Sequence, residues 1–165
     1  MATWDEIVAD HGPIVVRLAR QILGPGPDAE DVVQEVFLEA FRLRQRQEVG
    51  SWAGLLRKMA ARRSLDRLRR RRWMEPLNGQ ECADAGSGPH ETAVARELAE
   101  HLREAIARLP DGQAAAFSLR YFDELSYDQI ADALGIEPSA VGMALHKARA
   151  KLQTLLNVEA KGARL

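Results

Sequence analysis

Apolar residues recur at three- and four-residue steps along most of the chain, which is the spacing of one face of an α-helix. Thr3 and Glu6 have the spacing of a capping box, so we expect the first helix to begin near Trp4. The sequence His11-Gly12-Pro13 predicts a pause, and the GPGP sequence at residues 24–27 predicts a turn. Between the pause and the turn lies a second apolar stripe, formed by Ile14, Val15, Leu18, Ala19, Ile22 and Leu23.

The next predicted helix, DAEDVVQEVFLEAFRLR, has a broad apolar face and an acidic first turn that suits the positive end of the helix dipole. We expect Asp28 to cap this helix. Asp31, Gln34 and Glu35 project within one turn of each other on its polar side. Two interpretations stay open: the carboxylates serve capping and solubility, or this acid-amide-acid patch docks a basic partner.

A polar loop is predicted over residues 42–49. The following stretch, SWAGLLRKMAARRSLDRLRRRRW, joins an apolar helical stripe around Trp52 to a dense cluster of arginines. Only Asp66 opposes the cations within this stretch, so the helix repels itself unless a polyanion such as a nucleic-acid backbone neutralises it. The alternative is a solvated face, although solvated faces usually interleave both signs.

The residues after Trp73, MEPLNGQECADAGSGPHE, are rich in Gly, Pro and acids and show no helical period. They predict a flexible linker. A further hypothesis is that Glu75, Glu81, Asp84 and Glu91 lie over the arginine helix and screen it from DNA.

A second helical unit is predicted from about Glu91 to the end of the chain. Its first stripe, from Val94 to Leu109, stops at Pro110, and a short helix follows over residues 111–122. Ser126 with Gln129 is another capping box, and Gly135 is a natural left-handed helix stop. A final helix restarts at residues 137–139, with an apolar seam of Val141, Leu145, Ala148 and Leu152. Two helices joined by such a turn are typical of a helix-turn-helix, although any α-domain can pack two helices this way.

Composition narrows the class of protein. The chain has 165 residues, of which 46% are hydrophobic and 5% aromatic, so we predict an all-α fold. The net charge of −1 conceals the separation of acidic and basic segments. Cys82 is the single cysteine, which excludes a disulfide framework. Without a leader or a long apolar run the chain is predicted to be cytoplasmic. No catalytic constellation, cofactor motif or metal motif is visible, so we expect no enzyme, cofactor or metal.

The order of these elements resembles a bacterial RNA polymerase sigma factor of the extracytoplasmic-function (ECF) group. DAEDVVQEVFLEAFR resembles the polymerase-binding segment, SLDRLRRRR the promoter-melting helix, and ARLPDGQAAAFSLRYFDELSYDQIADALGI with ALHKAR the region for the upstream promoter element. The resemblance implies sigma region 2 over residues 1–74, a linker over 75–92 and sigma region 4 over 93–165. It also implies a factor that directs core polymerase to promoters, melts the −10 element and contacts the −35 element.

The resemblance also assigns roles to residues. Asp31, Gln34 and Glu35 align with positions that bind the β′ clamp helices, and a contact of region 4 with the β flap is implied. The implied −10 residues are Arg62, Arg63, Asp66, Arg67, Arg69 and Arg70. The implied −35 residues are Ser139, Gly142, Met143, His146, Lys147 and Arg149. An anti-sigma factor is the implied regulator, and the free chain is expected to be monomeric.

The sequence departs from the family pattern at several of these positions. Similar proteins usually carry asparagine where Arg62 stands, arginine where Ala114 stands, and Lys/Arg, serine and arginine through residues 142–144. Losing those cations removes charge-assisted contacts, so −35 recognition should shift toward DNA shape and thymine methyls. The alternatives are a stand-alone helix-turn-helix regulator and a protein-interaction module such as an adaptor.

Overall fold

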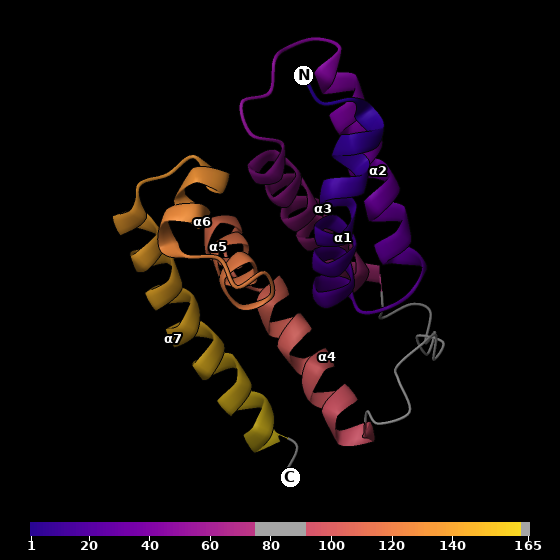
Figure 1. Ribbon diagram of the computed structural model, residues 1–165. Coiled ribbons are helices and arrows are strands. Elements are labelled where there is room, and N and C mark those ends of the chain that lie inside the picture. Colours follow the sequence, from indigo (N-terminus) through magenta and orange to yellow (C-terminus); the bar gives the residue numbers. More distant parts are fainter. Residues whose placement is uncertain (75–91, 163–165) are drawn as a thin grey trace.

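The computed structural model describes residues 1–74 and 92–162 (Figure 1). Within this part of the chain every regular element is an α-helix, which confirms the predicted all-α class. The predicted linker and the hypothesis that its acidic residues screen the arginine helix concern residues outside the part of the chain that the structure describes. The helices are α1 (Trp4–Leu23), α2 (Pro27–Arg44), α3 (Trp52–Met74), α4 (Ala93–Ala107), α5 (Asp111–Tyr121), α6 (Tyr127–Leu134) and α7 (Pro138–Gly162).

Helix α1 begins where predicted, because the Thr3 side chain and the Glu6 side chain each bond the other's backbone N–H. The predicted pause at residues 11–13 is wrong, since α1 continues through Pro13. A proline inside a helix removes one backbone donor and costs about 3 kcal/mol. Burial of the α1 side chains that flank it, including Ile7, Val15 and Leu18, offsets this cost.

Helix α2 begins one residue earlier than expected. Gly26 occupies the N-cap position and Pro27 the first turn, so Asp28 is not the cap and that prediction is wrong. Asp28 instead accepts hydrogen bonds from Arg71 of α3, at 2.7 and 3.1 Å. The helix also runs on to Arg44, so the loop predicted from Arg42 starts only at Gln45.

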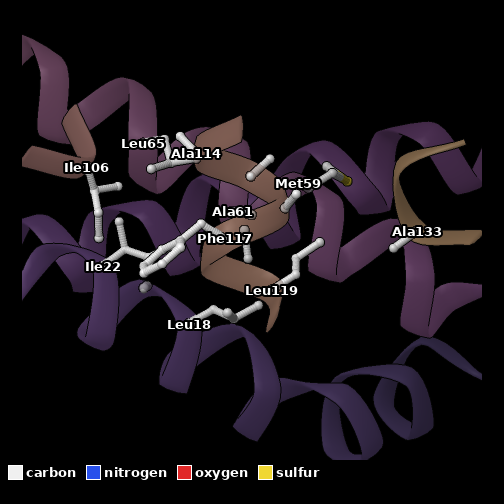
Figure 2. Close-up of a cluster of buried hydrophobic side chains, with 14 of the residues drawn as sticks. Leu18, Ile22, Met59, Ala61, Leu65, Ile106, Ala114, Phe117, Leu119 and Ala133 are labelled. Carbon is white, nitrogen blue, oxygen red and sulfur yellow. The ribbon is translucent and has the colours of Figure 1, made fainter. Parts of the chain in front are cut away.

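Helix α3 is unbroken over the predicted stretch and occupies the centre of the molecule. It packs against α1 and α2, which together with α3 form the N-terminal group. Its other side packs against α4, α5 and α6, which with α7 form the C-terminal group (Figure 1). Figure 2 shows side chains of both groups in one buried cluster, among them Leu18, Met59, Leu65, Ile106 and Phe117. The two groups therefore share a core.

The C-terminal group contains the predicted helix-turn-helix. Ser126 and Gln129 form the expected capping box at the start of α6, and Gly135 ends that helix in the left-handed region at φ 68°. The predicted seam of α7 is buried throughout. The stripe of α4 is less uniform, because Val94 and Leu98 are 74% and 63% exposed. Among the described helices, none is both long and apolar enough to cross a membrane.

Candidate nucleic-acid and polymerase interface

The arginines of α3 point in three directions, because successive residues of an α-helix are rotated by about 100°. Those at positions 63, 67 and 71 face α2, Arg69 faces the C-terminal group, and Arg62 and Arg70 face solvent. The residues predicted to bind the −10 element therefore do not form a single surface.

The face toward α2 is an ion-pair network. Arg67 lies 2.7 Å from Glu35 and 3.3 Å from Asp28, and Arg63 lies 2.5 Å from Glu39. The Glu39 hydrogen bond raises the pKa of Arg63 above its ordinary value, so that guanidinium remains charged. Acids from α2 thus neutralise in part the charge that the sequence left unopposed within α3.

This network reaches the predicted polymerase-docking patch. Asp31, Gln34 and Glu35 lie together on the outer side of α2, and the Asp31 side chain is 59% exposed. Arg67 lies 3.7 Å from Asp31, and Arg63 lies 3.8 Å from Glu35. The patch is accessible, but its carboxylates already form ion pairs with arginines of α3.

Arg69 is oriented toward the C-terminal group. Its guanidinium donates to the carbonyl oxygens of Leu109 at 2.9 Å and Ala107 at 3.4 Å, and it also pairs with Asp111. These carbonyls belong to the end of α4 and the turn before α5. This arginine therefore has intramolecular acceptors in place of a phosphate.

The solvent side of α3 carries Arg62, Asp66 and Arg70, spaced four residues apart on one face. All three side chains are exposed. In the described part of the chain neither Arg62 nor Arg70 has an ion pair, and Asp66 is 3.9 Å from Arg69. This face is the cationic surface of α3 that a polyanion can reach directly.

The predicted −35 residues lie on α7, mostly in the open. Ser139, Met143, His146, Lys147 and Arg149 are exposed, and Gly142 is half-buried. Gly142 lies beside Tyr127 of α6, since a Cβ built on it would be 3.6 Å from that ring.

Arg149 is held by α5. Its Nε donates to the Tyr121 hydroxyl at 2.6 Å, and the guanidinium carbon lies 5.6 Å from the centre of that ring. The hydrogen bond raises the pKa of Arg149. Tyr121 was not among the predicted site residues. Its position at the end of the helix that precedes the helix-turn-helix could have indicated a contact with that motif.

Asp123 was also missed. Its side chain is 0% exposed and accepts from Arg57 of α3 at 2.6 Å and from Arg17 of α1. These partners lie 66 and 106 residues away in sequence. No spacing rule could have connected them, because the contact exists only once the two groups have packed together.

A pocket of about 470 Å³ opens where the loop before α3 meets α6. Val49, Gly54 and Lys58 line one side, and Gln129 and Asp132 line the other. Within the described residues no cluster of His, Cys, Asp and Glu side chains is placed to hold a metal ion.

Comparison with known proteins identifies the two groups. The family model for sigma-70 region 2 matches residues 7–74, and the model for sigma-70 region 4 matches residues 99–152. A helix group of each kind, in this order, defines a member of the sigma-70 family.

The relatives place the chain within that family. It is 31% identical to the ECF RNA polymerase sigma factor SigD of Mycobacterium tuberculosis (strain ATCC 25618 / H37Rv), over 90% of this chain and 74% of SigD. It is also 31% identical to the ECF RNA polymerase sigma factor SigE of Mycolicibacterium smegmatis, over 94% of this chain but only 62% of SigE. The chain belongs to the ECF group of RNA polymerase sigma factors.

Two solved structures share the fold. CnrH in complex with the cytosolic domain of CnrY has a TM-score of 0.61 at 22% identity, covering 94% of this chain and 88% of that one. The sigma factor RpoE of Bartonella quintana, in complex with the anti-sigma factor NepR, has a TM-score of 0.56 at 21% identity, covering 93% and 96%. At these identities the likeness extends to the fold alone.

Proposed function

We propose that this chain is a promoter-specificity subunit that binds core RNA polymerase, directs it to particular promoters, melts the −10 element and contacts the −35 element. The observation that carries the proposal is the pairing of a region 2 match and a region 4 match, in the family's order, in a chain belonging to the ECF group. The chain acts by binding, and the polymerase carries out catalysis. Its place of action is the cytoplasm, where its polymerase works.

The docking site for polymerase is the α2 patch of Asp31, Gln34 and Glu35. A basic partner can add hydrogen bonds to the carboxylates of Asp31 and Glu35, since these side chains are 59% and 41% exposed. The family resemblance makes the β′ clamp helices this partner, and makes the β flap a partner of the C-terminal group.

The DNA contacts divide between α3 and α7. Arg62 and Arg70 on the open face of α3 approach the −10 element first, and Arg63, Asp66, Arg67 and Arg69 join when their present partners are exchanged. The exposed face of α7 enters the major groove at −35, as the second helix of a helix-turn-helix does. This division corresponds to region 2 over residues 1–74, a linker over 75–92 and region 4 over 93–165.

A protein that blocks these surfaces would regulate the factor. The RpoE structure contains such a partner, the anti-sigma factor NepR. We therefore include an anti-sigma factor among the partners of this chain.

Run-off transcription with core polymerase tests the proposal directly. The template is a library of fragments of the chain's own genome, because the promoter bases are not specified by the sequence. Defined transcripts should appear only when chain and core are both present. A stand-alone regulator would instead bind duplex DNA without polymerase, and an adaptor would bind no DNA even with core enzyme.

Variants of the docking patch sharpen the test. Asp31→Lys/Glu35→Lys should abolish association with core, and Asp31→Asn/Gln34→Ala should weaken it while leaving the Glu35 ion pairs in place. The matched control is Asp5→Lys/Asp10→Lys, which makes the same charge change on exposed positions of α1. Unchanged core binding by the first variant would refute the docking site.

A further inference from the structure

The solvent face of α3 carries a large aromatic side chain as well as arginines. Trp73, in the last turn of the helix, is 82% exposed. Successive residues of an α-helix are rotated by about 100°, so Trp73 lies within about 20° of Arg62 around the helix axis, and Arg70 lies about one turn before it. We call Arg62, Asp66, Arg70 and Trp73 the open row, which is about 16 Å long at about 1.5 Å per residue. The indole therefore belongs to the surface that a polyanion can reach directly.

Trp73 differs from the other tryptophans of the chain. Trp4 and Trp52 pack edge to face with 6.1 Å between their ring centres, and Trp4 also contacts two phenylalanine rings. Among the described residues the Trp73 ring has neither an aromatic nor a cationic partner. Trp4 and Trp52 therefore contribute to the packing of the N-terminal group, whereas the indole of Trp73 is open to a ligand.

The charges beside Trp73 indicate the kind of ligand. Arg70 and Arg72 are exposed, and neither forms an ion pair with another described residue. Asp66 interrupts these cations, and its carboxylate repels a phosphate placed against the middle of the open row. A carboxylate can instead accept a hydrogen bond from a base amino group, such as N4 of cytosine. The open row therefore suits a nucleic-acid strand that presents bases as well as phosphates.

An exposed indole in line with unpaired arginines is the combination that binds unpaired bases. Proteins that hold single strands place cations along the backbone and aromatic rings against the bases, because every base has a π-face whatever the sequence. Single exposed apolar side chains are common on protein surfaces. The alignment of Trp73 with Arg62 and Arg70, and not its exposure alone, is what indicates a base-binding surface.

We propose that Trp73 is a base-stacking residue of this sigma factor: its indole holds an unpaired base at one end of the DNA segment that α3 opens, while Arg62 and Arg70 bind phosphates of the same strand. The inference rests on the proposed function and adds to it a residue that the family resemblance did not assign. It predicts a preference for single-stranded over duplex DNA, because a base inside a duplex is already stacked on its neighbours.

Fluorescence of the free, full-length chain tests the contact without polymerase. At low salt an oligothymidine of about 12 nucleotides, within the usual site size of single-strand binding proteins, should quench the emission of the chain. Trp73 is the most exposed of the three tryptophans, so Trp73→Phe should abolish this quenching. The same strand in a duplex should quench less. Absence of quenching by saturating oligothymidine would overturn the proposal.

A membrane surface is the other ligand that attracts tryptophan together with arginine. Vesicles of phosphatidylglycerol therefore form a third arm of the fluorescence measurement. They should change the emission of Trp73 less than oligothymidine does, because Asp66 lies within the open row and repels an anionic surface. A larger response to the vesicles than to the strand would overturn the proposal in favour of a membrane contact.

Substitutions of Trp73 separate stacking from a general apolar contact. Trp73→Ala and Trp73→Leu should each weaken oligothymidine binding by about 5- to 150-fold, the affinity equivalent of one stacked base, whereas Trp73→Phe should weaken it by less than about threefold. Leucine keeps apolar surface but has no π-face. The control is Val158→Ala, at another exposed apolar side chain, which should bind as the unmodified chain does. Equal affinities of the leucine and phenylalanine variants would overturn the proposal.

Salt dependence and thermal melts show whether Trp73 acts on DNA or on the fold. Trp73→Ala removes no charge and should keep the log-log slope of affinity against salt, whereas Arg70→Ala should reduce that slope by about 0.7, the value for one phosphate contact on a single strand. Both variants should melt as the unmodified chain does, because both side chains are exposed. Weaker binding by Trp73→Ala together with a lowered melting temperature would assign the residue to the fold and overturn the proposal.

Run-off transcription connects the stacked base with promoter opening. On duplex promoters recovered with the unmodified chain, Trp73→Ala should give at least about fivefold less product than Trp73→Phe. The difference should narrow on templates whose −10 segment is already mismatched, since less base stacking must then be replaced. Equal product from the two variants on duplex templates would overturn the proposal. Failure of the unmodified chain to initiate transcription would instead refute the proposed function, and the fluorescence result would still decide whether Trp73 binds an unpaired base.

Discussion

Helices α3 and α7 are both basic and both proposed to bind DNA, yet the structure uses their cations differently. On α3 the arginines that face α2 and the C-terminal group are paired with carboxylates or carbonyls, and only the solvent face is free to meet DNA. On α7 the recognition face is exposed, and within the described residues only Arg149 of the six predicted −35 residues is held by another side chain. If both helices bind DNA as proposed, the arginines of α3 that face other helices must first leave their present partners, whereas the exposed side chains of α7 need no such exchange.

The largest expected effect is on the core that α3 shares with the C-terminal group. Leu65→Ala should lower the free energy of unfolding by about 2–5 kcal/mol, because it leaves a cavity where both groups meet. Val158→Ala, at a side chain of α7 that is 64% exposed, should change it by less than about 0.5 kcal/mol. Urea denaturation of the two variants measures both values, and equal effects would mean that α3 does not carry a shared core.

A smaller difference in stability is expected between arginine-to-alanine substitutions on two faces of α3. Arg67→Ala removes contacts with Asp28 and Glu35 and should cost about 1 kcal/mol of stability, whereas Arg70→Ala removes an exposed cation and should cost less than about 0.5 kcal/mol. Their order should reverse for DNA binding by the holoenzyme. Filter-binding titrations at several salt concentrations measure the DNA affinity, and urea denaturation measures the stability. The prediction fails if Arg67→Ala weakens DNA binding more than Arg70→Ala does.

On α7 the expected change concerns salt dependence and not stability. Lys147→Ala should reduce the log-log slope of promoter affinity against salt by about 0.9, since each phosphate contact releases counterions. Lys161→Ala, in the last turn of the same helix, is the control and should leave the slope unchanged. An unchanged slope in the first variant would place Lys147 off the DNA.

The smallest expected effect lies at the start of α1, distant from both helices. Bonds from Thr3 hold the pKa of Glu6 below its ordinary value, so the charged form is favoured in the folded state. This contribution to stability is present above about pH 4.5 and is lost as the pH falls through the lower folded pKa. Glu6→Gln should remove that part of the acid dependence, as measured by thermal melts of the variant and the unmodified chain between pH 3 and pH 6.

Much of the fold could be predicted because its signals are local. The capping boxes at Thr3 and Ser126, the left-handed stop at Gly135 and the seam of α7 each depend on residues within a few positions of one another. The same holds for which face of α7 is exposed. Local rules failed at Pro13 and Asp28, where burial and a distant arginine outweighed the usual preference of the residue.

What the sequence by itself determined is the set of helices, their order and their likeness to the sigma family. Only the tertiary structure decided which arginines of α3 remain free, that the acids opposing them come from α2, and that Asp123 joins the two groups. The physical reason is range: helix signals act over three or four residues, whereas these ion pairs join side chains from 24 to 106 positions apart and form only when burial of a common core brings their helices together.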